Sequence, residues 1–388
     1  MKTLDNLFGV QEVNYADRIG AIDKESAGVV KCQKNFPIFA GHDGKQKIFK
    51  PLSPTKPYAN PMFAYSEVWW SHLINNFIDE RAPRYQLARC HGMPPKAGQE
   101  IFLEKGTLVD SYLEPGQHDM NLLEYYRANP DPEVDIDQYT NYCDHIYDYR
   151  DIFNSELFSR QPELSSRLAE MVLTSIMTIN INFHYENVTF ICENDKVVDL
   201  APPIDHEFSL LSINPHNSQR RHEQKLANYE SLLTGTWVDK ELQTTHIDPI
   251  GRDAPLYATD HSNFDAMQSN LQIICDKHPN TVRNFIEKMQ KMREFLITHH
   301  IVFQSMSNFI EPFHDLESYV YYYRKPSHNN EEMAKLYESY VKVGSRKKIN
   351  LEKFGADAIK HTLLYSRLLE EQIEQYLEQP AVQSFAAI

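Results

Sequence analysis

The stretch TININFHYENVTFICENDKVVDLAPPIDHEFSL, residues 178–210, decides how the rest of the chain is interpreted. Its apolar segments 188–192 and 197–201 flank a polar turn, which is typical of a β-hairpin. Asn187 precedes the first strand and Asp205 follows the second. Because the two ends of a hairpin lie side by side, we expect this amide and this carboxylate to converge. Such oxygens bind hard cations, and Mg²⁺ often takes only one or two protein ligands beside substrate phosphates. The alternative is a surface hairpin in which both residues only form turns.

Length, net charge and cysteine spacing limit the cellular compartment and the kinds of partner that we expect. A length of 388 residues allows two lobes or domains, each with its own core. The net charge of −15 argues against nucleic acid or an anionic membrane as partner. The first residues carry early charges and no apolar signal segment, and the five cysteines form no CxxC pair. We therefore expect a cytoplasmic protein with reduced thiols, no nucleic-acid partner and no membrane association.

A lysine inside an apolar strand is the second notable feature. Residues 36–40 and 47–52 read as two strands joined by a tight turn that contains Gly41 and Gly44. Lys50 lies within the second strand, where burial is costly unless the ammonium meets an anion. The alternative is a lysine on an edge strand that blocks aggregation.

A helix with an early glutamate follows this strand. The apolar spacing in residues 65–80 is close to 3.6, with Ser66 as a candidate cap and Glu67 in the first turn. A strand lysine followed by a helix glutamate is the order that a Lys–Glu phosphate clamp needs. Acids are also common in first turns for dipole reasons alone.

The remaining pattern changes from strands to helices. Strand-like pieces between residues 84 and 113 predict a small antiparallel sheet that carries the one helix. From residue 122 onward the periodicity is helical, and residues 280–306 form a strongly amphipathic helix. Further helices are expected at 165–183, 330–343 and 355–378. The sequence thus predicts an α+β fold with a β-rich first part and a mainly helical second part.

Taken together, these motifs resemble those of the HipA-like kinases of bacteria, and in particular the shorter CtkA-like serine/threonine kinases. That family carries N-x-D-x-H-x-x-N, then a hairpin, then A-P-x-x-D. Here Asn180, His184 and Asn187 match the first motif, and Ala201-Pro202-Pro203-Ile204-Asp205 matches the second. The resemblance implies a two-lobed, protein-kinase-like α+β fold, with a small β-rich lobe at 1–116 and a helical lobe at 117–388. It also implies binding of ATP and Mg²⁺ and a protein or peptide substrate.

The resemblance further assigns roles to residues. Lys50 would hold phosphates and Glu67 would fix Lys50. Asn187 and Asp205 would hold the metal. The remaining implied positions are the phosphate-covering turn at Gly41 and Gly44, the adenine-binding hinge at Asp110 and Tyr112, and the catalytic loop at Asn182 and His184.

One position departs from the family pattern, because Asn182 stands where the catalytic aspartate is expected. An amide orients a hydroxyl but takes no proton at neutral pH, and general-base help is typically worth ~10²–10⁴-fold. Three interpretations follow. In the first, the chain is a phosphotransferase in which another base, such as Glu186, His184 or His206, substitutes. In the second, it is a nucleotide-binding pseudokinase that serves as a regulatory binding module. In the third, it catalyses another ATP-dependent transfer, such as nucleotidyl transfer or carboxylate activation for ligation.

His184 itself has two interpretations. In the HipA-like kinases that the motifs resemble, this histidine stabilises the catalytic loop through hydrogen bonds. The alternative is a zinc site with Asp205 and His206, since these residue types are zinc ligands. No HExxH-like spacing accompanies them.

Overall fold

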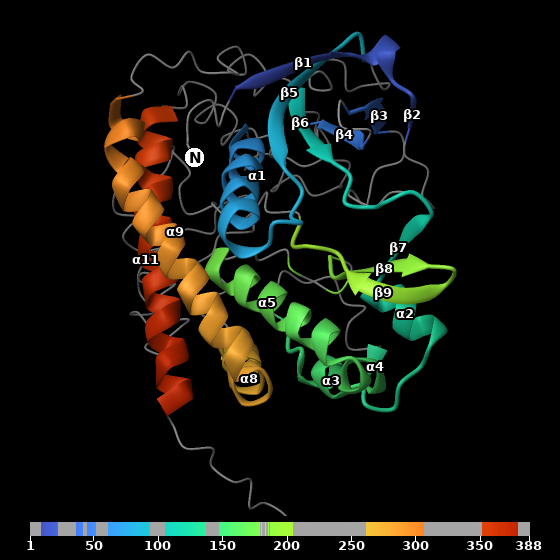
Figure 1. Cartoon of the computed structure of the whole chain (residues 1–388), viewed down its shortest axis with the longest axis vertical. Coiled ribbons are helices and arrows are strands. Elements are labelled where there is room, and N and C mark those ends of the chain that lie inside the picture. Colours follow the sequence, from blue (N-terminus) through green and yellow to red (C-terminus); the bar gives the residue numbers. More distant parts are fainter. Residues whose placement is uncertain are drawn as a thin grey trace, which may run out of the picture.

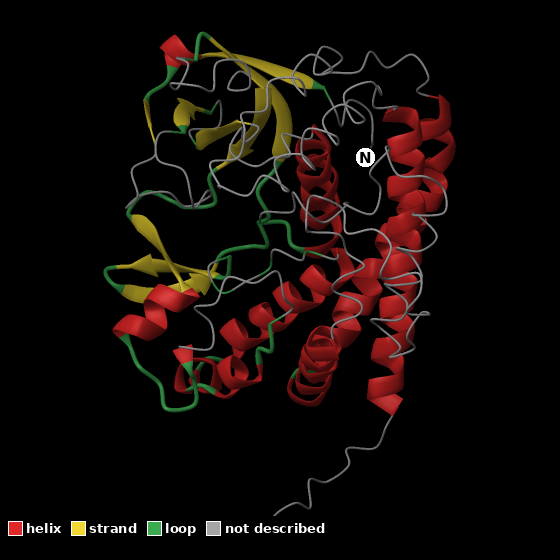
Figure 2. Ribbon diagram, turned by 180° about the vertical axis from the view of Figure 1, so that it is seen from behind, coloured by secondary structure: helices red, strands yellow, loops and turns green. Residues whose placement is uncertain are grey.

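The chain folds into two β-sheets and a mainly helical part. The computed structural model describes residues 9–21, 36–41, 45–51, 61–93, 105–136, 147–178, 180, 183, 185, 187–204, 261–305 and 351–378. Both sheets lie on one side of the molecule, and the long helices α9 (Pro279–Ser305) and α11 (Leu351–Glu378) lie on the other (Figures 1 and 2). The α+β class that the sequence predicts is therefore confirmed.

The first sheet has six strands in the order β1-β5-β6-β4-β3-β2. The strands that the sequence predicts, β3 to β6, pair antiparallel as expected, whereas β1, which the sequence does not predict, pairs with β5 in parallel. The sequence of β1, VQEVN, does not alternate between apolar and polar residues, so it carries no strand signal. The strands are β1 (Val10–Asn14), β2 (Gly20–Ala21), β3 (Pro37–Ala40), β4 (Gln46–Pro51), β5 (Tyr85–His91) and β6 (Lys105–Asp110).

Helix α1 (Pro61–Leu73) packs on β5 and β6 and continues as a π-helical turn, η2 (Ile74–Ile78). It begins earlier than predicted, with proline at the first helical position, so Ser66 is not its cap. Trp69 and Trp70 are fully buried. The Trp69 indole Nε1 donates to Thr362 Oγ1 of α11 at 3.2 Å. Helix α1 is thus held between the first sheet and the long helices (Figure 1).

The second sheet contains the hairpin that the sequence predicts. Strand β8 (Thr189–Glu193) pairs with β9 (Lys196–Leu200) and with β7 (Gln117–Asn121), both antiparallel. Asn194 and Asp195 both have positive φ, at 50° and 60°, as a tight two-residue hairpin turn requires. Strand β8 begins one residue later than the sequence predicts, and β9 begins one residue earlier.

The helical part is organised around α5 (Pro162–Thr178), which contacts β9 and the helices α8, α9 and α11. The apolar stripe predicted on α9 is buried, at Val282, Phe285, Met289, Met292 and Leu296. Helix α8 (His261–Lys277) was not expected, and the predicted helix at 330–343 lies outside the described residues. The shorter helices are α2 (Leu122–Ala128), α3 (Arg150–Asn154) and α4 (Glu156–Arg160).

None of the helices in the described part of the chain has both the length and the apolar character needed to cross a membrane.

Gly106 permits β6 to approach β4 closely. A Cβ added at this residue would lie 2.0 Å from the backbone oxygen of Lys50 and 2.8 Å from Cα of Pro51. Both neighbours are backbone atoms, which cannot rotate away as a side chain can. Only glycine therefore fits here, beside the lysine that the sequence singles out.

We expect Gly106→Ala to lower the free energy of unfolding by about 1–3 kcal/mol, because overpacking forces the two backbones apart. Urea denaturation measures the change. Gly20→Ala is the matched control, since the nearest atom to its Cβ would be Ile38 Cδ1 at 3.9 Å. The control should stay within about 0.5 kcal/mol of wild type. Equal stability of the two variants would contradict the close approach.

Candidate functional site

Lys50 lies on the face of the first sheet that α1 covers. Side chains alternate between faces along a strand. Ile48 belongs to the core cluster that contains the α1 side chains, whereas Phe49 belongs to a separate cluster on the other face. Lys50 shares the face of Ile48, and its register partner on β6 is Thr107. The strand therefore directs the lysine toward α1.

Glu67 of α1 meets this lysine. The Lys50 ammonium forms an ion pair with Glu67 Oε1, and Thr107 Oγ1 donates to Oε2 at 3.1 Å. The Glu67 side chain is 3% exposed and that of Lys50 is 16% exposed. The carboxylate is thus enclosed and held at both oxygens, while the lysine is mostly buried with a small exposed part.

The structural alternatives for these two residues do not hold. Strand β4 is interior to the sheet, between β6 and β3, so Lys50 is not an edge-strand lysine. Because α1 begins at Pro61, Glu67 lies beyond the first turn, and the expectation that placed it there is wrong. The helix dipole acts mainly on the first turn. Burial opposite Lys50 is the remaining reason for an acid at this position.

Asn187 stands at the base of the hairpin. It is buried and lies just before β8, and Leu122 N–H donates to the carbonyl of the next residue, Val188, at 2.9 Å. At this same open end of the hairpin, where β9 finishes, Ala201 N–H donates to Thr189 O at 2.8 Å. The chain that leaves β9 therefore passes beside Asn187. Asp205 lies outside the described residues, so its convergence with Asn187 stays a prediction.

The loop between α5 and β8 is anchored by buried side chains. Asn180, Phe183 and Tyr185 are buried, and Tyr185 Oη donates to Asp148 O at 2.8 Å. Phe183 N–H donates to Asn180 O at 3.1 Å. Asn182, His184 and Glu186, which share this loop, lie outside the described residues, as does His206. Their predicted roles, and the zinc alternative, are therefore untested.

The expected hinge follows β6. The Asp110 carboxylate pairs with Lys47 at 3.1 Å, on the opposite face of the sheet from Lys50. The N–H of Ser111 donates to Gln46 O at 2.8 Å. The ion pair and this hydrogen bond fix the segment to β4. Because the expected hinge role concerns backbone groups, the ion pair of the Asp110 side chain leaves that prediction open.

Tyr112 in the same segment donates its phenol to Asp119 Oδ2 at 3.3 Å. Burial, followed by the charge of Asp119, raises the pKa of Tyr112 well above its ordinary value. The phenol therefore stays protonated and a donor at neutral pH. This bond links the hinge segment to β7 of the second sheet.

The turn expected to cover phosphates is described only at its ends. Gly41 N–H donates to Lys45 O at 2.7 Å, so the two ends of the β3–β4 connection lie side by side. Gly44 lies outside the described residues. Within the described part of the chain, no group of three or more His, Cys, Asp or Glu side chains is arranged to hold a metal ion.

No family model matches the chain, and no curated protein and no solved structure shows significant similarity to it. The kinase-like resemblance of the motifs therefore stays a prediction.

Two residues of the site gave no signal in the sequence. Thr107 holds the second oxygen of Glu67, and Gly106 allows the strand to approach. Both lie in a strand-like stretch that the sequence identifies, but their contacts come from pairing with β4. A pairing register is set across the sheet and cannot be read from the local pattern.

We expect Glu67→Gln to cost about 3 kcal/mol of unfolding free energy, because it leaves the Lys50 charge largely buried without a counterion. The double variant Lys50→Met/Glu67→Gln should recover most of this loss, since it removes the orphaned charge. Urea denaturation of the two single variants and the double variant gives the coupling free energy. Additive losses would show that the pair is not an energetic unit.

Proposed function

We propose that this protein is an ATP- and Mg²⁺-dependent phosphotransferase of HipA-like type that acts on a protein or peptide. The proposal includes a two-lobed, protein-kinase-like arrangement with its boundary near residue 116. The observation that carries it is the ion pair between Lys50 on an interior strand and Glu67 on the helix packed against it. In protein kinases this pair holds the nucleotide phosphates.

The chemistry of the pair suits a phosphate ligand. An ammonium is a compact positive charge with three hydrogen-bond donors, as a phosphate ligand requires. Lys50 forms an ion pair with Glu67 and is partly exposed, at 16% of its side-chain surface. Buried ion pairs are often no more stabilising than apolar replacements, so stability alone is a weak reason for placing one here. A phosphate-binding role supplies the stronger reason.

Asn187 fits the second part of the site. Its amide oxygen is a hard ligand, and it lies at the end of the hairpin beside the chain that leads to Asp205. A Mg²⁺ ion held there would neutralise the charge that develops on the transferred phosphate. One amide and one carboxylate match the small protein ligand set that this ion takes in nucleotide sites.

In the proposed reaction, the substrate hydroxyl oxygen forms a bond to the γ-phosphorus as the bond to the departing ADP oxygen breaks. The hydroxyl proton must be accepted elsewhere. Asn182 orients the hydroxyl and takes no proton. The candidate acceptors in the sequence are Glu186, His184 and His206. Phosphoryl transfer depends mainly on positioning and on charge neutralisation, so a weakened base slows the reaction without abolishing it.

Asn182 also favours a second class of function. A nucleotide-binding pseudokinase would keep Lys50 and Glu67 and need no catalytic base. An enzyme that transfers a nucleotidyl group, or activates a carboxylate for ligation, would need no base for a hydroxyl either. Both alternatives keep the phosphate clamp and change only what happens to the bound ATP.

We further propose that the protein works in the cytoplasm. Cys90, Cys192 and Cys275 are buried free thiols, which supports a reducing compartment.

We expect Lys50→Met to raise the dissociation constant for ATP by about 10- to 100-fold, because it removes a charged hydrogen-bond donor to the phosphates. Isothermal titration calorimetry measures the change. Lys47→Met is the matched control, since Lys47 lies on the same strand and points to the opposite face. Similar ATP affinity in the two variants would remove Lys50 from the site.

The reaction type is tested by incubating the protein with Mg²⁺ and a panel of candidate acceptor peptides, using ATP labelled at either the α or the γ phosphate. Label transferred from γ-ATP, and rising about 10²-fold or more in Asn182→Asp, is the result expected of a weakened kinase. Transfer of the α label would indicate nucleotidyl transfer. Tight binding of ATP with neither label transferred, in wild type and variant alike, would favour the pseudokinase.

A further inference from the structure

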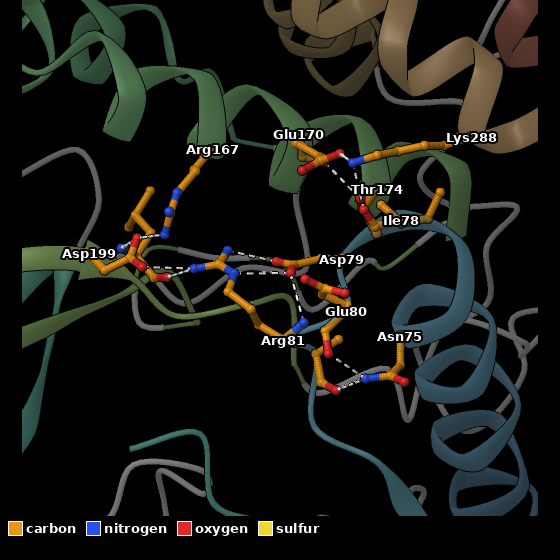
Figure 3. Close-up of polar contacts among 12 residues, drawn as sticks. Asn75, Ile78, Asp79, Glu80, Arg81, Arg167, Glu170, Thr174, Asp199 and Lys288 are labelled. Carbon is orange, nitrogen blue, oxygen red and sulfur yellow. Dashed lines mark hydrogen bonds and ion pairs between the residues drawn. The ribbon is translucent and has the colours of Figure 1, made fainter. Parts of the chain in front are cut away.

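A fork of hydrogen bonds from one arginine joins the segment after α1 to the hairpin. Arg81 lies between η2 and β5, and its Nε and Nη2 donate to the two carboxylate oxygens of Asp79 at 3.0 and 2.7 Å. Its Nη1 donates to Asp199 Oδ2 of β9 at 2.9 Å and to Leu200 O at 3.3 Å. Figure 3 shows the guanidinium between the two carboxylates. One planar side chain thus connects the segment between η2 and β5 to β9 of the second sheet.

The partner carboxylate on the hairpin is fixed as well. The other oxygen of Asp199 pairs with Arg167 of α5, so that Asp199 lies between two guanidinium groups (Figure 3). Asp199 is in the strand whose continuation leads to Asp205. Its position therefore sets where the expected metal-binding end of the hairpin begins.

The helix side of the connection is equally constrained. Lys288 of α9 donates to Ile78 O at 2.6 Å, at the end of η2, and also pairs with Glu170 of α5. Asn75 Nδ2 donates to Glu80 O at 2.8 Å and to Ala82 O at 2.7 Å. The segment that carries Arg81 is thus fixed to the end of the helix that carries Glu67 (Figure 3).

We propose that Arg81 is a positioning residue for the nucleotide site: it holds the segment after the helix that carries Glu67 against the hairpin whose open end carries Asn187. This inference rests on the proposed function. Arginine suits the role because its rigid fork satisfies two carboxylates and a carbonyl at once, which the single ammonium of lysine cannot do in the same geometry.

A purely stabilising role predicts a different result. The Arg81 side chain is 37% exposed, whereas those of Asp79 and Asp199 are 10% and 25% exposed. Loss of Arg81 leaves the mostly buried Asp79 carboxylate without its cation, so some loss of stability is expected. A positioning role adds a loss of the Mg²⁺ gain in ATP affinity, which a purely stabilising role does not require.

The test compares ATP affinity with Mg²⁺ and with EDTA, by calorimetry, in wild type, Arg81→Met and Asp199→Asn. The affinity in EDTA reports the lysine clamp, and the gain from Mg²⁺ reports the clamp and the hairpin acting together. We expect Arg81→Met to keep the ATP affinity in EDTA within about twofold of wild type and to lower the gain in affinity from Mg²⁺ by about tenfold.

Asp199→Asn breaks the same link from the hairpin side and should give the same pattern. Arg160→Met, in an exposed pair with Glu156, is the matched control and should behave as wild type.

The outcomes separate this inference from the function on which it rests. Wild-type protein that binds no ATP would reject both. Binding by wild type, with an unchanged Mg²⁺ gain in Arg81→Met and Asp199→Asn, would reject only the positioning role. Equal losses with Mg²⁺ and with EDTA, accompanied by a lowered melting temperature, would show a structural role instead and would also overturn the inference. Arg81→Lys should not restore the gain, because its charge lacks the fork.

Discussion

A lysine charge in the interior of a sheet requires a counterion, and much of the first part of the chain is arranged to supply it. Strand β4 directs Lys50 toward α1, and α1 provides Glu67, which is enclosed and also bonded to Thr107. Gly106 lets β6 approach so that Thr107 lies opposite Lys50. Helix α1 packs on β5 and β6, and its buried Trp69 also bonds to Thr362 of α11. Moving any of these elements would leave a largely buried charge unpaired, at a cost of several kcal/mol.

The second part of the chain is coupled to this pair through the end of α1. Helix α5 lies below the first sheet in Figure 1 and supplies Arg167 to the hairpin and Glu170 to Lys288 of α9. The same lysine bonds the last carbonyl of η2. Arg81 completes the connection by joining the segment after η2 to β9. The geometry of the proposed site thus depends on polar contacts between elements that are distant in sequence.

This distribution explains which features the sequence predicts. The hairpin at β8–β9 and the helix α9 follow from local patterns, a polar turn between apolar runs and a 3.6-residue stripe, and both are confirmed. The order of Lys50 and Glu67 predicts their pairing. By contrast, β1 pairs with β5, and Arg81 bonds to Asp199, which is 118 positions away in the sequence. Neither contact leaves a pattern in the local sequence. Asn182, His184 and Asp205 lie outside the described residues, and their roles stay predictions.

The central claim is that Lys50 contacts the phosphates of bound ATP. An acyl-phosphate derivative of ATP tests it most directly, because a lysine amine beside the terminal phosphate attacks the acyl group and releases ATP. Peptide mass spectrometry then identifies the acylated lysine. We predict that Lys50 is acylated and that excess Mg²⁺ and ATP protect it, while Lys47, on the opposite face of the sheet, shows no protection. Absence of acylation at Lys50, or acylation that ATP does not reduce, would contradict the account.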